Sequence, residues 1–355
     1  IASLIVFSSN AFAVIDNNAP VVKVRKGNCT DAGLTLDNCF TGVGPLITWI
    51  GNTRKPSASA PLLVDMGPGL YAGVVIECNG AWSHTTFRGA GAEETTFRSL
   101  TFDSCTNLNF ADLGVKNDVY GGIKWDGGGT STWTRVEVHS AGQAWYSDAC
   151  GPVRGSHYWF SSRLVNTAPG SSAPGYSERC DETWFFGSEI SNTVPVGAYP
   201  ASGGTVNARD RGIVHVYGSV LRTFIDGATQ AGGVAAARSE GGGEIHIHGT
   251  GIDVISNTGA NVVALAASSG GTIHANGAAY NMNTGGTITR IQNQGGHVHA
   301  PYLWGHIPDS PLVSVTGADI TTVTTGTSDG QPHLVIYSTN CSSKWYDTVD
   351  KICRP

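Results

Sequence analysis

Charged residues are scarce in this sequence, and the positive charges form no basic stripe. Asp, Glu, Lys and Arg together make up 14% of the 355 residues, against about 25% in typical globular proteins. The formal net charge is −6. Binding to nucleic acid generally requires a cluster of Lys and Arg on one face. The composition therefore argues against a nucleic acid partner.

Extended amphipathic helical patterns and long apolar runs are scarce as well. After the first residues, no run is long and apolar enough to predict a membrane span. None of the eight cysteines forms a Cys-x-x-Cys pair, which argues against a zinc ribbon. No acidic cluster indicates a calcium site.

The chain opens with an apolar segment that ends in Ala11-Phe12-Ala13. This pattern predicts residues 1–13 as the remnant of a secretory signal peptide, with a short buried strand as the alternative. Eight cysteines suit an exported, oxidised protein, so we expect a secreted, periplasmic or cell-surface location. Many pairings are open, and the spacing favours Cys29–Cys39, Cys78–Cys105, Cys150–Cys180 and Cys341–Cys353.

Glycine is abundant, and short alternating segments recur along the chain. Gly accounts for 48 residues, nearly twice the usual share of about 7%. The repeated segments are VEVHSAG, HYWFSSRL, TWFFGSEI, VHVYGSVL, IHIHGTGI, IHANGAAY and VHAPYLW. They align on Ser140, Ser161, Gly187, Gly218, Gly249, Gly277 and Tyr302, at intervals of 21, 26, 31, 31, 28 and 25 residues by subtraction. Similar strands at irregular intervals predict a parallel β-helix whose loops vary in length.

Alternation within these segments divides their side chains between two faces. The aliphatic set should face the core, together with His157 and Thr183, which blur the pattern. It consists of Val136, Val138, Phe185, Val214, Val216, Ile245, Ile247, Ile273 and Val298. The opposite set should form one external column, made of Glu137, Tyr158, Trp184, His215, His246, His274 and His299. A neighbouring external column contains His139, Phe160, Phe186, Tyr217, His248 and Asn276.

The remaining segments predict the ends of the helix. We expect an N-terminal cap region over 14–61, a parallel β-helix over 62–309, and an irregular last coil with a disulfide-stapled cap over 310–355. Asn166 and Asn192 lie 26 residues apart by subtraction in similar contexts. They predict equivalent turns, because Asn tolerates the left-handed conformation. Cys78–Cys105 and Cys150–Cys180 would each join adjacent coils.

The segment GPGLYAGVVIECNGAWSHTTFRGAGAEETTF and the seven aligned strands carry a family resemblance. Over roughly Leu62 to Trp304, the chain resembles the right-handed parallel β-helix proteins of the pectate lyase-like superfamily. The resemblance implies an all-β fold, a single-stranded right-handed parallel β-helix. Members include polysaccharide lyases, hydrolases, esterases, epimerases and phage tailspikes. The catalytic motifs of the polygalacturonase-like hydrolases, pectate lyases and pectin methylesterases are absent, so no catalytic residue is carried over.

The external columns are the main functional signal. Aromatic rings with His and Glu along stacked strands predict a surface that binds an extended polysaccharide, and exposed aromatics gathered in a patch call for a partner. The alternative is an exposed sheet that uses these side chains for stability. The predicted substrate-binding residues are Glu137, His139, Tyr158, Phe160, Trp184, Phe186, Tyr217, His246, His248, His274 and His299.

Catalysis is a further hypothesis, because glycosidases usually need two carboxylates near the bond. Glu182 and Asp210, which precede strands on successive coils, and His215 are the candidate catalytic residues of a lyase or glycoside hydrolase. The alternative interpretation of these charges is a set of solvated loop residues. A non-enzymatic adhesin, appendage or filament subunit is the competing function for the whole protein.

A metal site is the alternative interpretation of the histidines. His215, His246, His274 and His299, with His248, offer imidazole ligands that suit zinc, copper and nickel. A straight column of residues, however, does not converge tetrahedrally on one point. We therefore expect neither a metal nor another cofactor.

Overall fold

The computed structural model describes most of the chain between residues 19 and 300. The described residues are 19–27, 29, 38–78, 82–119, 121–148, 154–166, 173–195, 204–226, 234–257, 259, 261–286 and 288–300, together with the backbone of six strands between 303 and 354. The predicted signal peptide remnant, Cys150 and Cys341 lie outside these residues. No helix among the described residues is long and apolar enough to cross a membrane.

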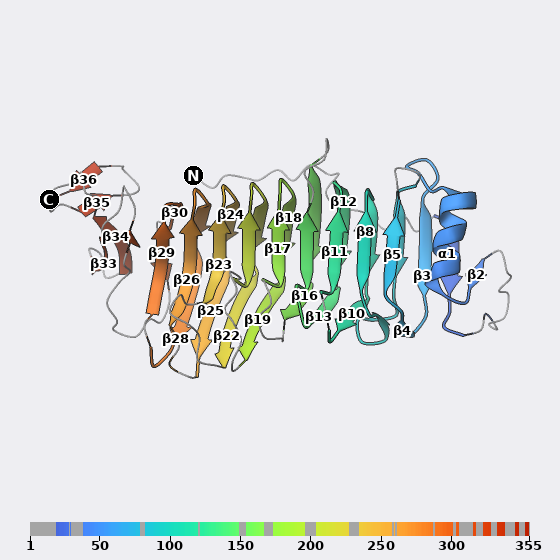
Figure 1. The fold of residues 1–355 in the computed structure, drawn as a ribbon, viewed down its shortest axis with the longest axis horizontal. Coiled ribbons are helices and arrows are strands. Elements are labelled where there is room, and N and C mark those ends of the chain that lie inside the picture. Colours follow the sequence, from blue (N-terminus) through green and yellow to red (C-terminus); the bar gives the residue numbers. More distant parts are fainter. Residues whose placement is uncertain are drawn as a thin grey trace.

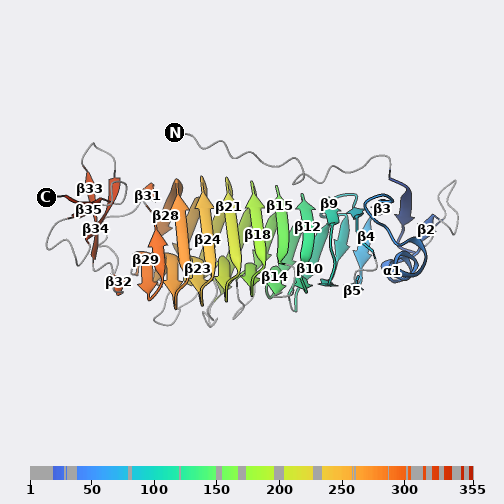
Figure 2. The same cartoon turned by 90° about the horizontal axis from the view of Figure 1, so that it is seen from above.

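Three long parallel sheets run along the molecule (Figures 1 and 2). We call them sheets I, II and III, and each coil contributes one strand to each in turn. The first full coil contains β3 (Leu62–Met66), β4 (Gly69–Tyr71) and β5 (Val74–Glu77), and the last contains β30 (His297–His299), β31 (Leu303–Trp304) and β32 (Val315–Thr316). Strands account for 60% of the residues and helices for 5%. The protein is therefore an all-β parallel β-helix, as the repeat predicts.

Within each sheet, a strand lies beside its equivalents from the neighbouring coils. In spatial order, sheet I comprises β2 Cys39–Phe40, β1 Val21–Val24, β3 Leu62–Met66, β6 Thr85–Arg88, β9 Leu108–Ala111, β12 Gly129–Thr134, β15 Gly155–Phe160, β18 Glu182–Phe186, β21 Ile213–Tyr217, β24 Glu244–His248, β27 Thr272–Asn276 and β30 His297–His299. Sheet II comprises β31 Leu303–Trp304, β28 Ala278–Asn283, β25 Gly251–Ser256, β22 Val220–Asp226, β19 Glu189–Pro195, β16 Arg163–Asn166, β13 Glu137–Ser140, β10 Gly114–Asn117, β7 Thr95–Phe97 and β4 Gly69–Tyr71. Sheet III comprises β32 Val315–Thr316, β29 Ile288–Gln294, β26 Val262–Ser268, β23 Val234–Glu240, β20 Val206–Arg209, β17 Gly175–Glu178, β14 Trp145–Asp148, β11 Ile123–Asp126, β8 Leu100–Asp103 and β5 Val74–Glu77.

The register of sheet I confirms six of the seven aligned segments. His215 pairs with His246, His246 with His274, and His274 with His299. The segment VEVHSAG is the exception, because its strand β13 belongs to sheet II. The strand of sheet I in that coil is β12, whose outward residues are Thr132 and Thr134. Both strands alternate with period two, and the 21-residue interval at this point was the sign of the wrong alignment.

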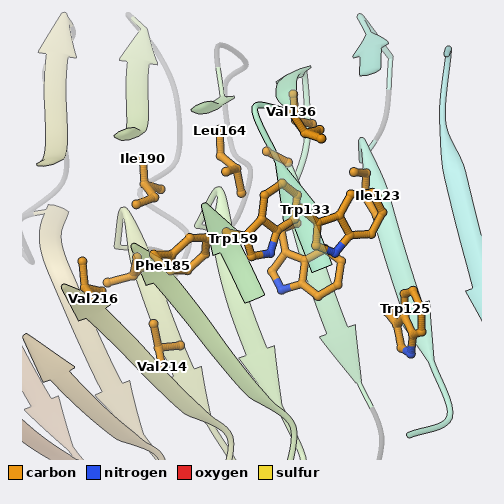
Figure 3. Close-up of a cluster of buried hydrophobic side chains, with 14 of the residues drawn as sticks. Ile123, Trp125, Trp133, Val136, Trp159, Leu164, Phe185, Ile190, Val214 and Val216 are labelled. Carbon is orange, nitrogen blue, oxygen red and sulfur yellow. The ribbon is translucent and has the colours of Figure 1, made fainter. Parts of the chain in front are cut away.

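The core is a continuous column of apolar side chains inside the coils (Figure 3). The predicted inward residues of sheet I are buried, and Phe185, Val214 and Ile245 are fully so. In the earlier coils Trp133 and Trp159 stack with ring centroids 4.9 Å apart. The stacking follows from the register, which places equivalent side chains of successive coils about 4.8 Å apart.

Several polar side chains inside the coils form hydrogen bonds with one another. His157 and Thr183 point inward and are fully buried, as their positions in the alternation predict. His157 Nδ1 lies 2.8 Å from the hydroxyl of Ser131, which also accepts a hydrogen bond from Trp133 Nε1 at 2.7 Å. Trp145 Nε1 donates to Thr183 Oγ1 at 3.0 Å. These bonds offset the cost of removing the groups from water.

A two-residue corner joins sheet I to sheet II in most later coils. Its first residue has positive φ, for example 48° at Ser161 and 54° at Gly187. Its second residue is a buried Ser whose hydroxyl accepts a backbone N–H from the preceding coil. Ser162 N donates to Ser188 Oγ at 3.2 Å, and Ser188 N donates to Ser219 Oγ at 3.0 Å. The hydroxyls thus satisfy backbone groups that the sharp bend removes from the sheets.

Asn166 and Asn192 occupy equivalent positions, but these positions are not left-handed turns. The two residues pair in register between β16 and β19, and both are buried. Neither is among the residues with positive φ. The prediction that the two asparagines occupy equivalent positions is therefore confirmed, and the prediction of a left-handed backbone is wrong.

A column of glycines lies at the corner that leads from sheet III into sheet I. At Gly243, an added Cβ would lie 2.3 Å from the carbonyl oxygen of Ala208 on the preceding coil. The equivalent residues Gly212 and Gly271 approach the preceding coil similarly, at 2.3 Å and 2.4 Å. A side chain has no room at these three positions, which therefore require glycine, whereas the coil before them has Asp181 at the equivalent place.

Helix α1 (Val43–Trp49) and the short η1 (Ile50–Arg54) lie at the N-terminal end of the solenoid (Figure 1). Leu46 and Ile50 are fully buried and belong to the same core as the coils. After the last coil, four strands form an antiparallel sheet where the sequence predicted irregular structure. They are β33 Thr322–Thr327, β34 Pro332–Tyr337, β35 Trp345–Asp347 and β36 Ile352–Arg354.

Two predicted disulfides are present among the described residues. Cys29 bonds to Cys39 and Cys78 bonds to Cys105, which joins successive coils at the N-terminal end. Cys180 is also disulfide-bonded, and its predicted partner Cys150 lies outside the described residues. The predicted Cys341–Cys353 pair includes Cys341, which lies outside them as well.

The glycine column yields a stability prediction. We expect Gly243→Ala to lower the free energy of unfolding by about 1–3 kcal/mol, because the new Cβ would press on the backbone of the preceding coil. Gly251→Ala is the matched control, since a Cβ there would meet only Val220 Cγ2 at an ordinary 3.9 Å. Thermal and chemical denaturation of both variants measures the difference. Equal stabilities would contradict the proposed close approach.

Candidate functional site

The outward face of sheet I displays two columns of stacked rings. In the first, Trp184 lies on His215 with centroids 3.6 Å apart and planes 8° from parallel. The stack continues to His246 at 4.7 Å and to His274 at 4.9 Å. Tyr158 precedes it, 6.2 Å from Trp184. We call this column and the neighbouring one, described next, the ring strip.

The neighbouring column of the ring strip is shorter. Phe160 stacks on Phe186 at 5.1 Å, Phe186 on Tyr217 at 5.5 Å, and Tyr217 on His248 at 4.8 Å. Asn276 follows in register with His248. The structure therefore brings together every predicted binding residue that lies on the six strands from β15 to β30. His299 ends the first column, with its ring tilted by 56° from His274.

Stacking turns the ring faces toward one another. Each interior ring of the strip has a neighbouring ring on both faces, so its edge is the part directed away from the sheet. Only Tyr158 and Phe160 begin a column, and the residues in register before them are Thr132 and Thr134. An interior ring such as Trp184 therefore offers a ligand its edge and not a flat face.

Two carboxylates lie beside the histidines of the first column. His215 Nε2 donates to Glu182 Oε1 at 2.8 Å. His246 Nε2 lies 2.8 Å from Glu244 Oε1, and His274 Nε2 lies 3.6 Å from the same oxygen. Glu182 and Glu244 both pair in register with Ile213, so they are two strands apart on one face. Glu244 was not among the predicted site residues, although its place two residues before His246 was the available signal.

Hydrogen bonding and charge set the ionisation of these groups. Burial on its own would raise the pKa of Glu182, but the hydrogen bond and the charge of His215, with the charge of Arg154, lower it below the ordinary value. Burial lowers the pKa of His246, and the charges of His215 and His274 lower it further against the opposing effect of Glu244. The site therefore favours a charged Glu182 and a neutral His246.

The structure places the candidate catalytic residue Asp210 away from Glu182 and His215. Asp210 lies in the left-handed corner before β21, with φ of 49°. Its carboxylate faces Arg209, with Arg209 Nε 3.5 Å from Oδ2. Glu182, in contrast, bonds to His215 on the outward face. Of the three candidate catalytic residues, only Glu182 and His215 are therefore in contact with each other.

Glu137 and His139 are not part of the ring strip, because β13 lies in sheet II. His139 Nε2 donates to Glu137 Oε1 at 2.6 Å, and Arg163 Nη1 donates to the same carboxylate at 2.8 Å. Arg222 continues this row by bonding Glu189 at 3.0 Å. These residues form an alternating-charge row along sheet II, and we assign them to surface ion pairing. Such surface ion pairs typically contribute about 0–1 kcal/mol each to the free energy of unfolding.

A second His–carboxylate pair lies inside the coils and is inaccessible. His157 Nε2 is 3.8 Å from Asp181 Oδ2, and both side chains are fully buried. Burial lowers the pKa of His157 against the effect of Asp181, so the neutral ring is favoured. Its neighbours include Trp125 and Trp145, with ring centroids 4.9 Å away. No substrate reaches this pair, and we assign it to the core.

A pocket of about 380 Å³ lies at the corner between sheets II and III of the earlier coils. Its polar lining includes Asn117, Lys124, Gln143 and Tyr146. The hydroxyl of Tyr146 lies 2.9 Å from a carboxylate oxygen of Asp148 and 2.9 Å from one of Glu178, and it can donate to either. The sequence pattern of alternating strands gave no signal for this pocket, because corners do not follow the strand period. It is not part of the ring strip.

The ring strip yields a prediction about acid stability. Burial and the charges of His215 and His274 lower the pKa of His248. A lowered pKa means that the unfolded chain binds the proton first, so stability is present above about pH 6.5 and is lost as pH falls through the folded pKa. We expect His248→Gln to lose less stability than wild type between pH 7 and pH 5, measured by denaturation midpoints. Asn276→Gln, in the same column, should behave like wild type, and equal slopes for all three proteins would refute the effect.

Comparisons with known proteins leave the family open. No family model matches the sequence, and no curated protein matches it. Among solved structures, the chain is similar to ORF18 of Geobacillus virus E2, at 12% identity and a TM-score of 0.41. The match covers 89% of this chain and 66% of that one, slightly less than two thirds. A likeness of this strength carries no argument about function.

Proposed function

We propose that the ring strip of sheet I binds an extended polysaccharide. The observation that carries the proposal is the row of rings in strand register, from Tyr158 through Trp184 and the histidines to His299. Because Trp184 Nε1 and His215 Nδ1 are buried, the polar edges open to a ligand in the middle of this row are those of His246 and His274, with the carboxylates beside them. Successive strands lie about 4.8 Å apart, so equivalent groups repeat along the axis. A linear polymer with regularly spaced hydroxyls matches such a row.

The chemistry of the row supports hydroxyl recognition. Imidazole nitrogens donate or accept according to tautomer, and carboxylates accept only. Glu182 and Glu244 are partly exposed, at 21% and 39% of their side-chain surface. Both therefore have oxygen atoms available to sugar hydroxyls in addition to their histidine partners. A hydrogen bond to a charged group typically contributes about 1.5–3 kcal/mol of net stabilisation.

Binding is better supported than cleavage. Glycoside hydrolysis needs an acid and a second carboxylate placed for the same bond, and Asp210 does not accompany Glu182. The Glu182–His215 pair is compatible with proton transfer, as in a lyase, and cleavage is therefore tested together with binding. An adhesin or appendage role remains the competing function, in which the ring strip only stabilises the sheet.

We also propose that the chain is a member of the pectate lyase-like superfamily and an exported protein. The parallel coils support the first proposal, and the disulfides support the second, because they persist in oxidising compartments. The predicted signal peptide belongs to the same proposal. Mass spectrometry of the mature protein would identify the cleavage site.

The glycan proposal is tested by titrating the full chain against neutral and acidic polysaccharides. We expect Trp184→Ala to weaken binding by about 1–3 kcal/mol, because its removal collapses the stack that holds the polar edges. His139→Ala, on sheet II, is the matched control and should bind as wild type does. Released reducing ends or unsaturated products would reveal cleavage. If wild type binds none of the polymers, or Trp184→Ala binds as tightly, the strip is structural.

Acidic polymers should bind more tightly at low pH. The pKa values of His246 and His248 are lowered, so these rings become charged only below the usual histidine range of about 6–6.5. We expect affinity for an anionic glycan to rise as pH falls below about 6, and affinity for a neutral glycan to change little. Isothermal titration at several pH values measures both. A parallel rise for both polymers would exclude charge as the cause.

A further inference from the structure

Three metal-ligating side chains converge at the C-terminal half of the ring strip. Glu244 and His246 come from β24, and His274 comes from the next strand of the sheet, β27. One ligand atom from each residue lies within 4.8 Å of the other two. Among the described residues, no other three His, Cys, Asp or Glu side chains bring their ligand atoms this close together.

We propose that Glu244, His246 and His274 form a zinc-binding site on the outer face of sheet I. Two imidazole nitrogens and one carboxylate oxygen are ligands that zinc prefers, and three protein ligands leave a position for water or another donor. The inference is independent of the glycan proposal, since it rests on these three residues alone.

Coordination requires the three side chains to rotate toward one another, because the ligand atoms now lie within 4.8 Å and the two imidazole rings stack 4.9 Å apart. Ligand atoms of a tetrahedral zinc ion lie about 3.3 Å from one another, because Zn–N and Zn–O distances are about 2.0–2.2 Å. Glu244 Oε1 is 2.8 Å from His246 Nε2 and 3.6 Å from His274 Nε2. The ion would replace the hydrogen bond that now joins the carboxylate to the imidazole.

Strand register explains why the group converges although its histidines form a straight column. His246 and His274 pair in register, and their rings stack with planes 10° from parallel. Their nitrogens therefore face the same way. Glu244 is two residues before His246, so it projects from the same face beside the column and supplies the ligand that a column alone lacks. The expectation of no metal considered only the histidines.

The neighbouring histidines fit less well. His215 Nε2 is committed to Glu182 at 2.8 Å. His299 is tilted by 56° from His274, with centroids 6.1 Å apart. His248 lies in the other column, stacked on Tyr217. The chain therefore contains matched controls that carry the same functional groups on the same sheet.

The test uses the full chain after removal of metal with a chelator. Isothermal titration with zinc chloride should show saturable binding, and Glu244→Gln, His246→Gln and His274→Gln should each weaken it by about tenfold or more. Glu182→Gln and His248→Gln are the controls and should change the affinity less than about twofold. Circular dichroism establishes that each variant retains its strands.

A second measurement does not depend on the variants. Cobalt added to the wild-type protein should produce visible absorption bands typical of nitrogen and oxygen ligands, and zinc should remove them. Zinc should also raise the melting temperature of wild type, because a ligand that binds only the folded state stabilises it. Absence of saturable binding at millimolar zinc would overturn the proposal. Equal zinc affinity of wild type and the three variants would also overturn the proposal, because other residues would then bind the zinc.

Discussion

Parallel backbone pairing in constant register is the constraint on which the rest of this structure depends. Once β15, β18, β21, β24 and β27 are aligned without slippage, each residue stands over its equivalent in the next coil. Equivalent residues of successive coils therefore form a column, and the side chains of each column must fit beside one another at a spacing of about 4.8 Å. Aromatic and imidazole rings tolerate it by stacking. Serine hydroxyls tolerate it by accepting backbone N–H groups, and glycine tolerates it where coils approach closely.

Charged columns need a different solution, and sheets I and II differ in how they provide it. Sheet II alternates acidic and basic residues in register from Glu137 to Arg163 and Glu189, and Arg222 reaches Glu189 from a position two residues further along the next strand. Sheet I instead places carboxylates beside histidines, which remain neutral over much of the pH range because burial lowers the pKa of His246 and His248. This difference makes sheet I the face whose charge responds to mild acid, whereas the ion pairs of sheet II respond to salt.

The sequence predicted the solenoid and most of the ring strip because both depend on period-two alternation and repeat spacing. It misplaced Glu137 and His139 because VEVH alternates as well as any strand of sheet I, while the true strand β12 presents only threonines outward. The 26-residue intervals from Glu137 to Arg163 and on to Glu189 could have revealed the charge row. Ring orientation and the convergence of Glu244 with two histidines depend on side-chain rotation, which no spacing specifies.

The corners differ in how much chain they contain. Sheet I is entered through the short corners 179–181, 210–212, 241–243 and 269–271 and left through 161–162, 187–188, 218–219 and 249–250. The connections from sheet II to sheet III have unequal lengths, 167–174, 196–205, 227–233, 257–261 and 284–287. From β15 onward, the extra chain thus lies at one edge, where it shifts no residue of sheet I. Chain inserted at that edge would leave the geometry of the ring strip unchanged. Duplication of a whole coil would lengthen each column of the ring strip by one residue.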